Sequence, residues 1–315
     1  MTNANTGVLR RVWLSLAAVG LAVAMAMAGT TSAEAAAERA TPNKPDHAKC
    51  STGRNIPLNH VSIQLWTFNS AINQHGIEHV LTELADMGYR NIEPFSYHGL
   101  SAQEFKDLAD DLGLRIRSRH GSTNEANWDS HLADAKLFNQ RWTGSGGFAS
   151  PGINSYENVL ATAETLNRLG ERSVKNGTGK IFGHNHAVEF ETQYVDVEGD
   201  GELKSAWQIL VENTDPRWVT FQLDVGWADR AGEDSVALLE EFGDRIELLH
   251  VKDFVTDEDG NWVSWVPVGD GEIDWPAVFR AAQGNVKLYV VEQDFPADAF
   301  ETAQRSIDYL DCLSF

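Results

Sequence analysis

The runs VTFQLD (residues 219–224) and IELLH (residues 246–250) decide the fold of this chain. Both are rich in apolar, β-branched or aromatic residues, and each ends in a potential metal ligand, Asp224 or His250. Two further runs have the same form, KIFGHNH at residues 180–186 and KLYVVE at residues 287–292. In a barrel of parallel strands the carboxyl ends open on one face, so ligands distant in sequence converge there. The pattern predicts a metal site, and the metal site predicts an enzyme.

Strand-like and helix-like runs alternate along the rest of residues 56–315. Further strands are expected at residues 61–66, 91–95 and 115–120, and the glycine-rich residues 140–150 predict a loop or a short, irregular strand. Helices are expected at residues 77–87, 101–112, 155–176, 205–213, 235–242, 275–282 and 297–310, and within 128–138. Seven clear strands and one doubtful strand, each followed by a helix, predict a (β/α)8 TIM barrel rather than an open sheet.

The N-terminal region predicts export of the protein. Arg10 and Arg11 precede an apolar stretch and small residues with A-x-A sequences, so residues 1–37 are interpreted as a signal peptide. The two arginines loosely resemble a twin-arginine signal, and an ordinary secretion signal is the alternative. No cysteine follows the apolar run closely, so no membrane anchor is expected. Residues 38–55 are interpreted as a linker and residues 56–315 as the barrel domain.

Charge and cysteine content restrict the partners and the compartment. The net charge of −21 disfavours nucleic acid and anionic membranes as partners, because both are bound through Lys and Arg. The only cysteines are Cys50, before the first strand, and Cys312, in the last helix. Export would place them in an oxidising compartment, so a Cys50–Cys312 disulfide is predicted. Two free thiols are the alternative.

Several segments together resemble the xylose isomerase-like TIM barrels. This superfamily of sugar phosphate isomerases and epimerases also holds ketose 3-epimerases, inosose dehydratases and lyases of 3-keto-glycosides. The resemblance spans residues 61–294 and rests on the order and spacing of QLW (64–66), HNHAVEF (184–190), LDVGW (223–227), HVKDF (250–254), VGDGEIDW (268–275) and VVEQD (290–294). It implies an (β/α)8 barrel that binds a divalent metal ion.

The resemblance also implies which residues hold the metal. The ligands carried over are His184, Asp224, His250 and Glu292. Many relatives have Glu at the first of these positions, so His186 or Glu189 could replace His184 as a ligand. Carboxylates combined with imidazoles suit Mn²⁺, which is the preferred ion here, with Co²⁺, Zn²⁺, Fe²⁺ or Mg²⁺ as alternatives.

The chemistry implied is proton abstraction next to a sugar carbonyl, which requires a base and a cation for the developing oxyanion. Glu189 lies near the position of the acid/base glutamate of related epimerases, and Glu292 could be ligand and base at once. Lys252, His120 and His186 could supply an acid or hold hydroxyl groups. The residues expected to line the substrate pocket are Trp66, Glu93 and Trp227.

Each of these residues also has a purely structural interpretation. Asp224 could cap the turn at Val225 and Gly226. Glu93 could pair with Arg90 or Arg115 on the surface. The two tryptophans could simply pack, and the acidic run VDVEGDG (residues 195–201) predicts a solvated loop because it lacks EF-hand spacing.

Three functions therefore remain open from the sequence. The first is a secreted, metal-dependent isomerase, epimerase or lyase acting on a neutral sugar or keto-glycoside. The second is a metal-dependent phosphodiesterase of the same superfamily, and the third is a sugar-binding barrel without catalysis. Sugar phosphates are cytoplasmic intermediates, and Lys252 is the only cation found at these strand ends, so a phosphorylated substrate is not expected.

Overall fold

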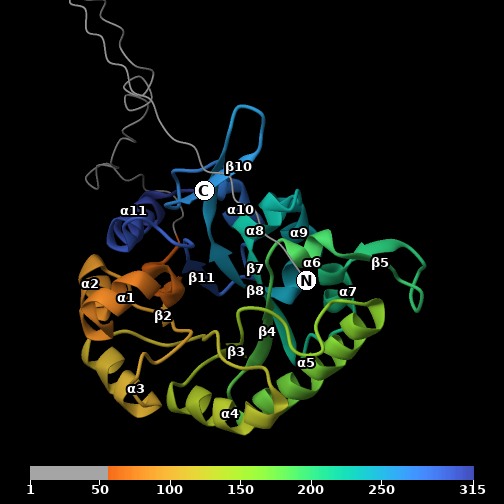
Figure 1. Ribbon diagram of the computed structural model, residues 1–315, viewed down its shortest axis with the longest axis horizontal. Coiled ribbons are helices and arrows are strands. Elements are labelled where there is room, and N and C mark those ends of the chain that lie inside the picture. The colour runs from red at the N-terminus through yellow and green to blue at the C-terminus, as the bar shows by residue number, and fades with distance from the viewer. Residues whose placement is uncertain (1–55) are drawn as a thin grey trace, which may run out of the picture. The chain divides into compact units, whose positions relative to one another are not determined.

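The computed structural model describes residues 56–315; the predicted signal peptide and linker and Cys50 lie outside the described residues. Seven parallel strands form one sheet in the order β2-β1-β11-β8-β7-β4-β3. Helices surround this sheet (Figure 1). The strands are β1 (Val61–Gln64), β2 (Ile92–Glu93), β3 (Trp142–Gly144), β4 (Lys180–His184), β7 (Val219–Asp224), β8 (Ile246–Val251) and β11 (Leu288–Val291).

Residues 115–121 close the sheet into a barrel between β2 and β3. On the β2 side, Ile92 N–H donates to the Arg115 carbonyl at 2.9 Å, and His120 N–H donates to the Pro94 carbonyl at 3.0 Å. On the β3 side, Gly121 N–H donates to the Gly144 carbonyl at 2.8 Å. The expected strand at 115–120 is therefore present only as isolated bridges, but it occupies the eighth position of the predicted TIM barrel.

Eleven α-helices are present within residues 56–315, and all eight predicted helices are among them. They are α1 (Asn69–His75), α2 (Ile77–Met87), α3 (Ala102–Asp111), α4 (Trp128–Leu137), α5 (Tyr156–Asn176), α6 (Val188–Glu191), α7 (Ala206–Glu212), α8 (Val225–Arg230), α9 (Ser235–Phe242), α10 (Trp275–Ala281) and α11 (Ala299–Cys312). Short 3₁₀ segments occur at Leu58–His60, Leu65–Phe68, Glu125–Asn127 and Gly243–Arg245.

Local sequence signals explain where these elements begin and end. A capping box begins α3, since Ser101 Oγ accepts from Glu104 N–H and the Glu104 carboxylate accepts from Ser101 N–H. Helix α2 ends at Gly88, whose φ of 106° is a left-handed conformation that favours glycine. Strand β1 ends at Gln64, two residues earlier than expected. The Gln64 side chain accepts from Trp66 N–H and turns the chain into a 3₁₀ segment.

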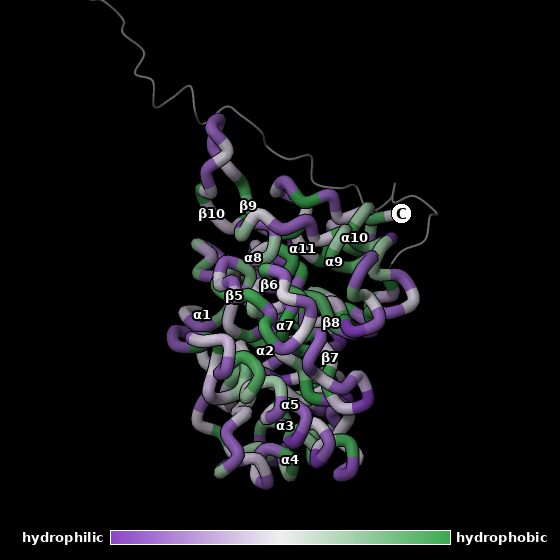
Figure 2. Tube along the Cα trace, turned by 90° about the vertical axis from the view of Figure 1, so that its right-hand side faces the viewer, coloured by the Kyte–Doolittle hydropathy of each residue, from purple (hydrophilic) through white to green (hydrophobic). Residues whose placement is uncertain are grey.

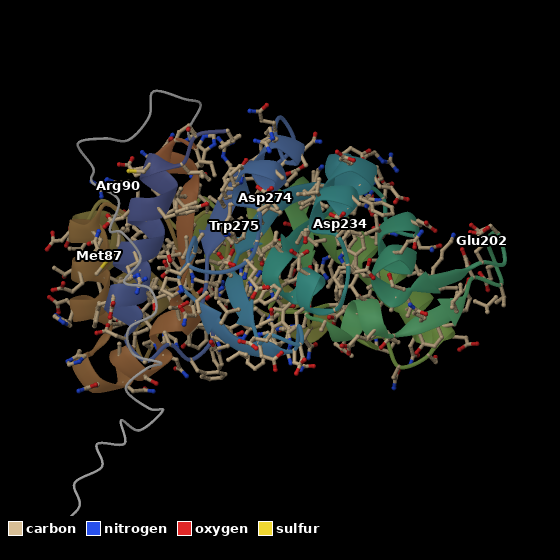
Figure 3. The ribbon with its side chains drawn as sticks, turned by 90° about the horizontal axis from the view of Figure 1, so that it is seen from above. Met87, Arg90, Glu202, Asp234, Asp274 and Trp275 are labelled. Atoms are coloured by element: carbon tan, nitrogen blue, oxygen red, sulfur yellow. The ribbon has the colours of Figure 1, made fainter. Side chains whose placement is uncertain are left out.

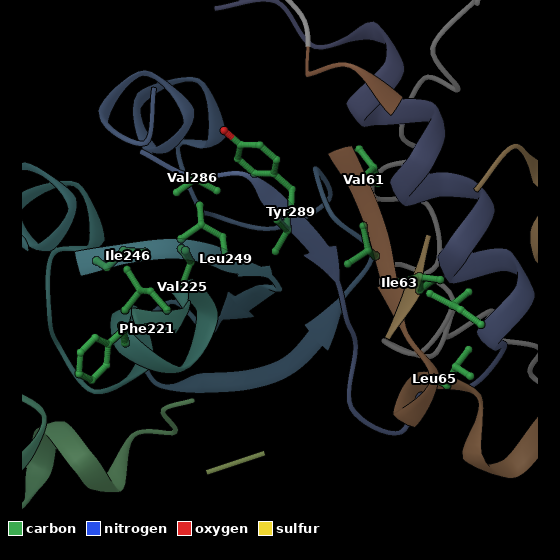
Figure 4. Packing of buried hydrophobic residues seen from close by; sticks show 14 of the residues in the cluster. Val61, Ile63, Leu65, Phe221, Val225, Ile246, Leu249, Val286 and Tyr289 are labelled. Atoms are coloured by element: carbon green, nitrogen blue, oxygen red, sulfur yellow. The ribbon is translucent and has the colours of Figure 1, made fainter. Parts of the chain in front are cut away.

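Alternation along the strands divides the buried residues between two environments. Outward-facing residues such as Val61, Ile63 and Leu249 belong to the large cluster that packs against the helices (Figure 4). Inside the barrel, a separate apolar layer consists of Trp142, Phe182, Leu248, Leu288 and Val290. Stacked interior layers of this kind are typical of TIM barrels. This layer makes the centre of the barrel a packed core rather than a channel.

The surface is polar, as the charge of the chain requires. Figure 2 shows hydrophobic segments concentrated in the strands and inner helix faces, with hydrophilic segments at the periphery. Arg90 and Glu202 lie toward opposite edges of the ribbon in Figure 3, and Asp234 and Asp274 are also exposed. No helix within residues 56–315 combines the length and apolar character needed to span a bilayer.

Two β-hairpins were not predicted. Strands β5 (Gln193–Val195) and β6 (Leu203–Ser205) form one of them, and the acidic run at 195–201 lies mainly in its loop, as expected. Strands β9 (Asp253–Thr256) and β10 (Trp262–Val266) form the other, which extends away from the barrel (Figures 1 and 2). Both are insertions after barrel strands, β4 and β8, so they add walls at the carboxyl end of the barrel.

Candidate active site

The four predicted ligands lie at the carboxyl ends of four neighbouring strands. The strand order β11-β8-β7-β4 places Glu292, His250, Asp224 and His184 next to one another, and all four are buried. Asp224 is the direct register partner of His250, and His250 is the partner of Val290 on β11. The convergence expected from the sequence is therefore present in the structure.

Asp224, His250 and Glu292 form a compact group, here called the ligand group, whose potential ligand atoms lie within 4.8 Å of one another. His250 Nδ1 is 3.0 Å from Glu292 Oε2 and 3.6 Å from Asp224 Oδ2. Burial by itself lowers the pKa of His250, but Glu292, Asp224 and Glu93 outweigh it and raise the pKa well above its usual value. In this geometry His250 is a cation held between carboxylates.

Lys252 is a second buried cation in the same group. Its Nζ lies 2.7 Å from Glu292 Oε2, 2.8 Å from Asp294 Oδ2 and 3.4 Å from Asp224 Oδ2. Burial opposes its charge, but these three carboxylates outweigh burial and raise the pKa of Lys252 above its ordinary value. Lys252 stays protonated at neutral pH and is a fixed positive charge beside the ligand group.

Glu93 organises the floor of the site from the opposite side of the barrel. Its carboxylate accepts hydrogen bonds from Gln64, Ser118 and Gln222, and it lies 2.9 Å from His250 Nε2 and 3.1 Å from His120 Nε2. Burial raises its pKa, but the two histidines outweigh burial and lower the pKa of Glu93 well below its usual value. The alternative of a surface pair with Arg90 or Arg115 is therefore wrong.

His184 belongs to a neighbouring group rather than to the carboxylate group. It clusters with His120 and His250, and its Nδ1 lies 3.1 Å from Gln222 Oε1. Burial, followed by the charges of His250 and His120, lowers the pKa of His184 well below its usual value. His184 is consequently a neutral imidazole, the form that binds a metal.

The two other residues considered for the first ligand position lie further along the same loop. The His186 ring is 5.0 Å from the His184 ring and 5.4 Å from Trp227. Glu189, at the start of α6, accepts a 2.7 Å hydrogen bond from His186 N–H. Its carboxylate makes no hydrogen bond or ion pair with the ligand group within the described chain. Burial raises the pKa of Glu189.

Asp224 combines its structural and its predicted ligand role. Its Oδ1 caps α8 by accepting from Trp227 N–H at 3.0 Å, as the structural interpretation expected. Its backbone is held by Asn185, whose side chain bonds both the N–H and the carbonyl of Asp224. Its Oδ2 is buried and has no hydrogen-bond partner within residues 56–315. One carboxylate oxygen is thus used for the fold and the other is directed to the site.

These features fit a divalent cation. Asp224 Oδ2 offers a buried oxygen that makes no hydrogen bond within residues 56–315, Glu292 offers a second carboxylate, and His250 offers an imidazole nitrogen, with His184 in the adjoining histidine group. Such mixed oxygen and nitrogen donors suit Mn²⁺, Zn²⁺ and related ions. Without a metal, Lys252 and protonated His250 balance the carboxylates. Metal binding would therefore require His250 to release a proton.

The predicted pocket tryptophans lie at the rim. Trp66, in the 3₁₀ turn after β1, packs edge-on against Phe95 and Phe295. Trp227 lies on α8 and packs against His186 and against Trp265 of the second hairpin. Both have partly exposed side chains. They flank the ligand group from different sides of the barrel.

Sequence reasoning missed several residues of the site. Gln222 was detectable, because it precedes Asp224 by two residues and so lies on the same face of β7. It connects His120, His184 and Glu93. Asp294 and Trp265 carried no such signal, because Asp294 follows the end of β11 and Trp265 lies in a hairpin outside the barrel sheet. Their positions depend on the loop after β11 and on the β9–β10 hairpin.

A sequence profile described as Xylose isomerase-like TIM barrel matches residues 81–311, and the chain belongs to this family. The chain is similar to the inosose dehydratase of Geobacillus thermodenitrificans (strain NG80-2), with 29% identity over 163 residues, covering 46% of this chain and 51% of that protein. It thus spans about half the length of the curated relatives that it matches.

Solved structures show the same fold. A sugar phosphate isomerase/epimerase from Parabacteroides distasonis ATCC 8503 has a TM-score of 0.67 at 24% identity, covering 84% of this chain and 98% of that chain. A xylose isomerase-like TIM barrel protein from Mycobacterium smegmatis, in complex with magnesium, has a TM-score of 0.56 at 15% identity, covering 74% and 86%. The resemblance inferred from the sequence motifs is confirmed.

Proposed function

We propose that the protein is a secreted, divalent-metal-dependent enzyme that abstracts a proton next to the carbonyl of a keto-sugar or keto-glycoside. The observation that carries this proposal is the buried group of Asp224, His250 and Glu292 at the carboxyl ends of the barrel strands, in which Asp224 Oδ2 makes no hydrogen bond within residues 56–315. The similarity to dehydratases favours loss of a neighbouring leaving group as the following step, rather than epimerisation.

The metal ion would be held by Asp224, His250 and Glu292, with His184 as a further ligand. When bound, it would polarise the substrate carbonyl as a Lewis acid. Lys252 adds a fixed positive charge that stabilises the enolate oxygen, because its ammonium is buried beside the ligand group and cannot reorient into water. This is a different role from the acid considered from the sequence, since a raised pKa makes Lys252 a poor proton donor.

Glu189 is the proposed base. Burial raises its pKa above the ordinary value of a glutamate, which makes its carboxylate a stronger base. Its hydrogen bond from His186 N–H fixes one carboxylate oxygen and leaves the other available. His186 and His120, both partly exposed near the ligand group, are proposed to hold substrate hydroxyl groups. Trp66 and Trp227 are proposed to border the sugar.

A metal-free sugar-binding barrel is the second candidate, and one observation favours it. Lys252 and His250 already neutralise the carboxylates that would otherwise attract a metal ion. Metal content separates the two functions: the enzyme contains about one tightly bound divalent ion per chain, and a sugar-binding barrel of this type contains none.

Hydrogen–deuterium exchange tests the reaction class without requiring the product to be known. The metal-loaded protein is incubated in D₂O with ketoses, a keto-inositol and a 3-keto-glucoside, and loss of the proton next to the carbonyl is followed by NMR. Epimerase, isomerase and lyase all produce exchange or net conversion. If a folded protein with one metal ion per chain shows neither deuterium exchange nor net conversion with any of these substrates, proton abstraction on this class of sugar is refuted.

A further inference from the structure

A second cavity, of about 590 Å³, opens at the amino ends of the strands, on the face opposite the candidate active site. Residues that begin or immediately precede strands line much of it, including His60, Trp142, Lys180 and Lys287. Its volume lies in the range of about 300–1,000 Å³ that is common for small-molecule sites. The apolar layer that contains Trp142 separates this cavity from the ligand group above it.

The lining is positively charged although the chain carries a net charge of −21. Arg117, Arg141, Lys180 and Lys287 line the cavity, and Glu247 is the one carboxylate among its lining residues. A bulge in β8 explains the position of Glu247, because Phe221 pairs with Ile246 and Gln222 already pairs with Leu248. Glu247 binds Lys180 Nζ at 2.6 Å and Trp142 Nε1 at 2.7 Å.

The two arginines have no such partner. Neither the Arg117 nor the Arg141 guanidinium makes a hydrogen bond or an ion pair with any other part of residues 56–315. Burial, followed by the charges of Arg115 and Arg141, lowers the pKa of Arg117. Elsewhere in the barrel, Arg168 and Arg217 are paired with carboxylates. The two arginines therefore lie at the same cavity without a paired carboxylate from the described chain, since Glu247 is paired with Lys180.

Gln140 provides an independent observation. Gln140 lines the same cavity and is only 3% exposed, yet neither Nε2 nor Oε1 of its side chain has a hydrogen-bond partner within the described residues. A buried amide normally has partners, and an unsatisfied one indicates a bound water, ion or ligand. Gln140, Arg117 and Arg141 line the same cavity, so one bound group can lie among them.

We propose that this cavity binds a phosphate or sulfate group, either as the free ion or as the ester of a small organic molecule. Arg117 and Arg141 supply planar guanidinium groups, which match the geometry of such oxyanions, and Gln140 supplies an amide donor. Lys287, at the rim, adds positive charge. The site is separate from the active site, so it can bind a phosphorylated or sulfated ligand even though the substrate is a neutral sugar.

A purely structural role for the two arginines and the proposed anion site predict opposite effects on the melting temperature when the arginines are removed. The carboxyl ends of α4 and α5 lie near the cavity, since Asn139 and Gly177 line it, and cations stabilise helix carboxyl ends. If the arginines serve the helices, removing them lowers the melting temperature of the ligand-free protein. If they form an anion site, removing them relieves repulsion and leaves the melting temperature unchanged or higher.

The test uses the full chain, the double variant Arg117→Gln/Arg141→Gln and the control Arg280→Gln, which removes an exposed charge on α10 outside the cavity lining. Isothermal titration calorimetry is done with sodium phosphate, sodium sulfate, glucose 6-phosphate and glucose. We expect saturable binding of the anions, at least tenfold weaker in the double variant and unchanged in the control. Glucose is expected not to bind, and anion affinity should fall as NaCl is added.

The probes also identify the source of the anion. Tighter binding of glucose 6-phosphate than of inorganic phosphate indicates an ester ligand, and equal or weaker binding indicates the free ion; both support the site. The proposal is overturned if no anion binds the unmodified chain, if the double variant binds as tightly, or if the ligand-free double variant melts at a lower temperature than the control. None of these readouts depends on activity at the opposite face.

Discussion

Replacement of Glu189 by Gln separates the proposed base from the metal ligands. Glu189 is 8% exposed, and Oε2 accepts a 2.7 Å hydrogen bond from His186 N–H. A glutamine carbonyl can accept the same bond, so the loop should keep its conformation. Exchanging a charged acceptor for a neutral one costs about 1 kcal/mol, and removing a buried charge offsets part of this. We therefore expect the free energy of unfolding to change by less than about 1 kcal/mol.

The effect on catalysis should be far larger. Loss of a general base lowers turnover by about 10² to 10⁴, which corresponds to roughly 3–5 kcal/mol of activation free energy. The assay combines kcat on the substrate identified by deuterium exchange, metal content by elemental analysis, and the urea midpoint. Glu191→Gln is the matched control, because Glu191 lies on the same helix but is exposed. The control should keep its turnover.

Two outcomes would contradict this reasoning. If Glu189→Gln keeps more than about one tenth of kcat, Glu189 is not the base, and Glu292 becomes the candidate. If the variant loses its metal together with its activity, Glu189 is a ligand and His184 is not. A change in the urea midpoint as large as the change in the activation barrier would show that the loop itself had been disrupted.

Three further predictions follow from other parts of the molecule. Asp224→Asn keeps the cap on Trp227 N–H but replaces Oδ2, the oxygen that makes no hydrogen bond within residues 56–315, so metal affinity should fall by at least about tenfold in a folded protein. Equal metal content in the variant and the unmodified chain would contradict the ligand assignment. Burial raises the pKa of Asp229 to about 6, above the pKa of an aspartate in the unfolded chain. The protonated Asp229 carboxyl therefore contributes fully to stability at low pH, and this contribution is lost as the pH rises through 6. Asp229→Asn should remove this pH dependence, so between pH 4 and pH 7 the free energy of unfolding of the variant should rise by about 2 kcal/mol relative to that of the unmodified chain. Urea unfolding measures this difference, and the exposed Asp86→Asn is the control. A difference that does not change with pH would refute the prediction. Cys50 lies outside the described residues, so the Cys50–Cys312 disulfide remains a prediction. The disulfide should raise the free energy of unfolding by roughly 5 kcal/mol at most. Two alkylated thiols in the unreduced, denatured protein would exclude it.

The barrel was predictable because its signals are local or periodic. Helix caps such as Ser101 and Asp298 are short-range patterns, and the structure contains both. The apolar runs of β7, β8 and β11 end in polar residues at the points where the strands end. The short third strand and the irregular segment 115–121 were harder to predict, because glycines and charged residues interrupt their alternation.

The composition of the candidate site was largely predictable, but its contacts were not. Strand ends identify Asp224, His250 and Glu292 because topology brings the carboxyl ends of parallel strands together. No local pattern shows that Lys252 Nζ lies between three carboxylates, or that Glu93 holds His250 from the opposite wall. Those distances depend on barrel closure, which brings together residues as distant in sequence as Glu93 and His250, 157 positions apart.

The sequence by itself determined the alternation of strands and helices, the polarity of the surface and the identity of the residues at the strand ends, because each depends on near neighbours along the chain. Only the tertiary structure decided which oxygen of Asp224 makes no hydrogen bond within residues 56–315, that His184 groups with His120 and His250 rather than with the carboxylates, and that Arg117, Arg141 and Gln140 line one cavity. The physical reason is that charge, burial and the availability of a hydrogen-bond partner belong to an environment, and an environment assembled from distant strands exists only after the barrel has closed.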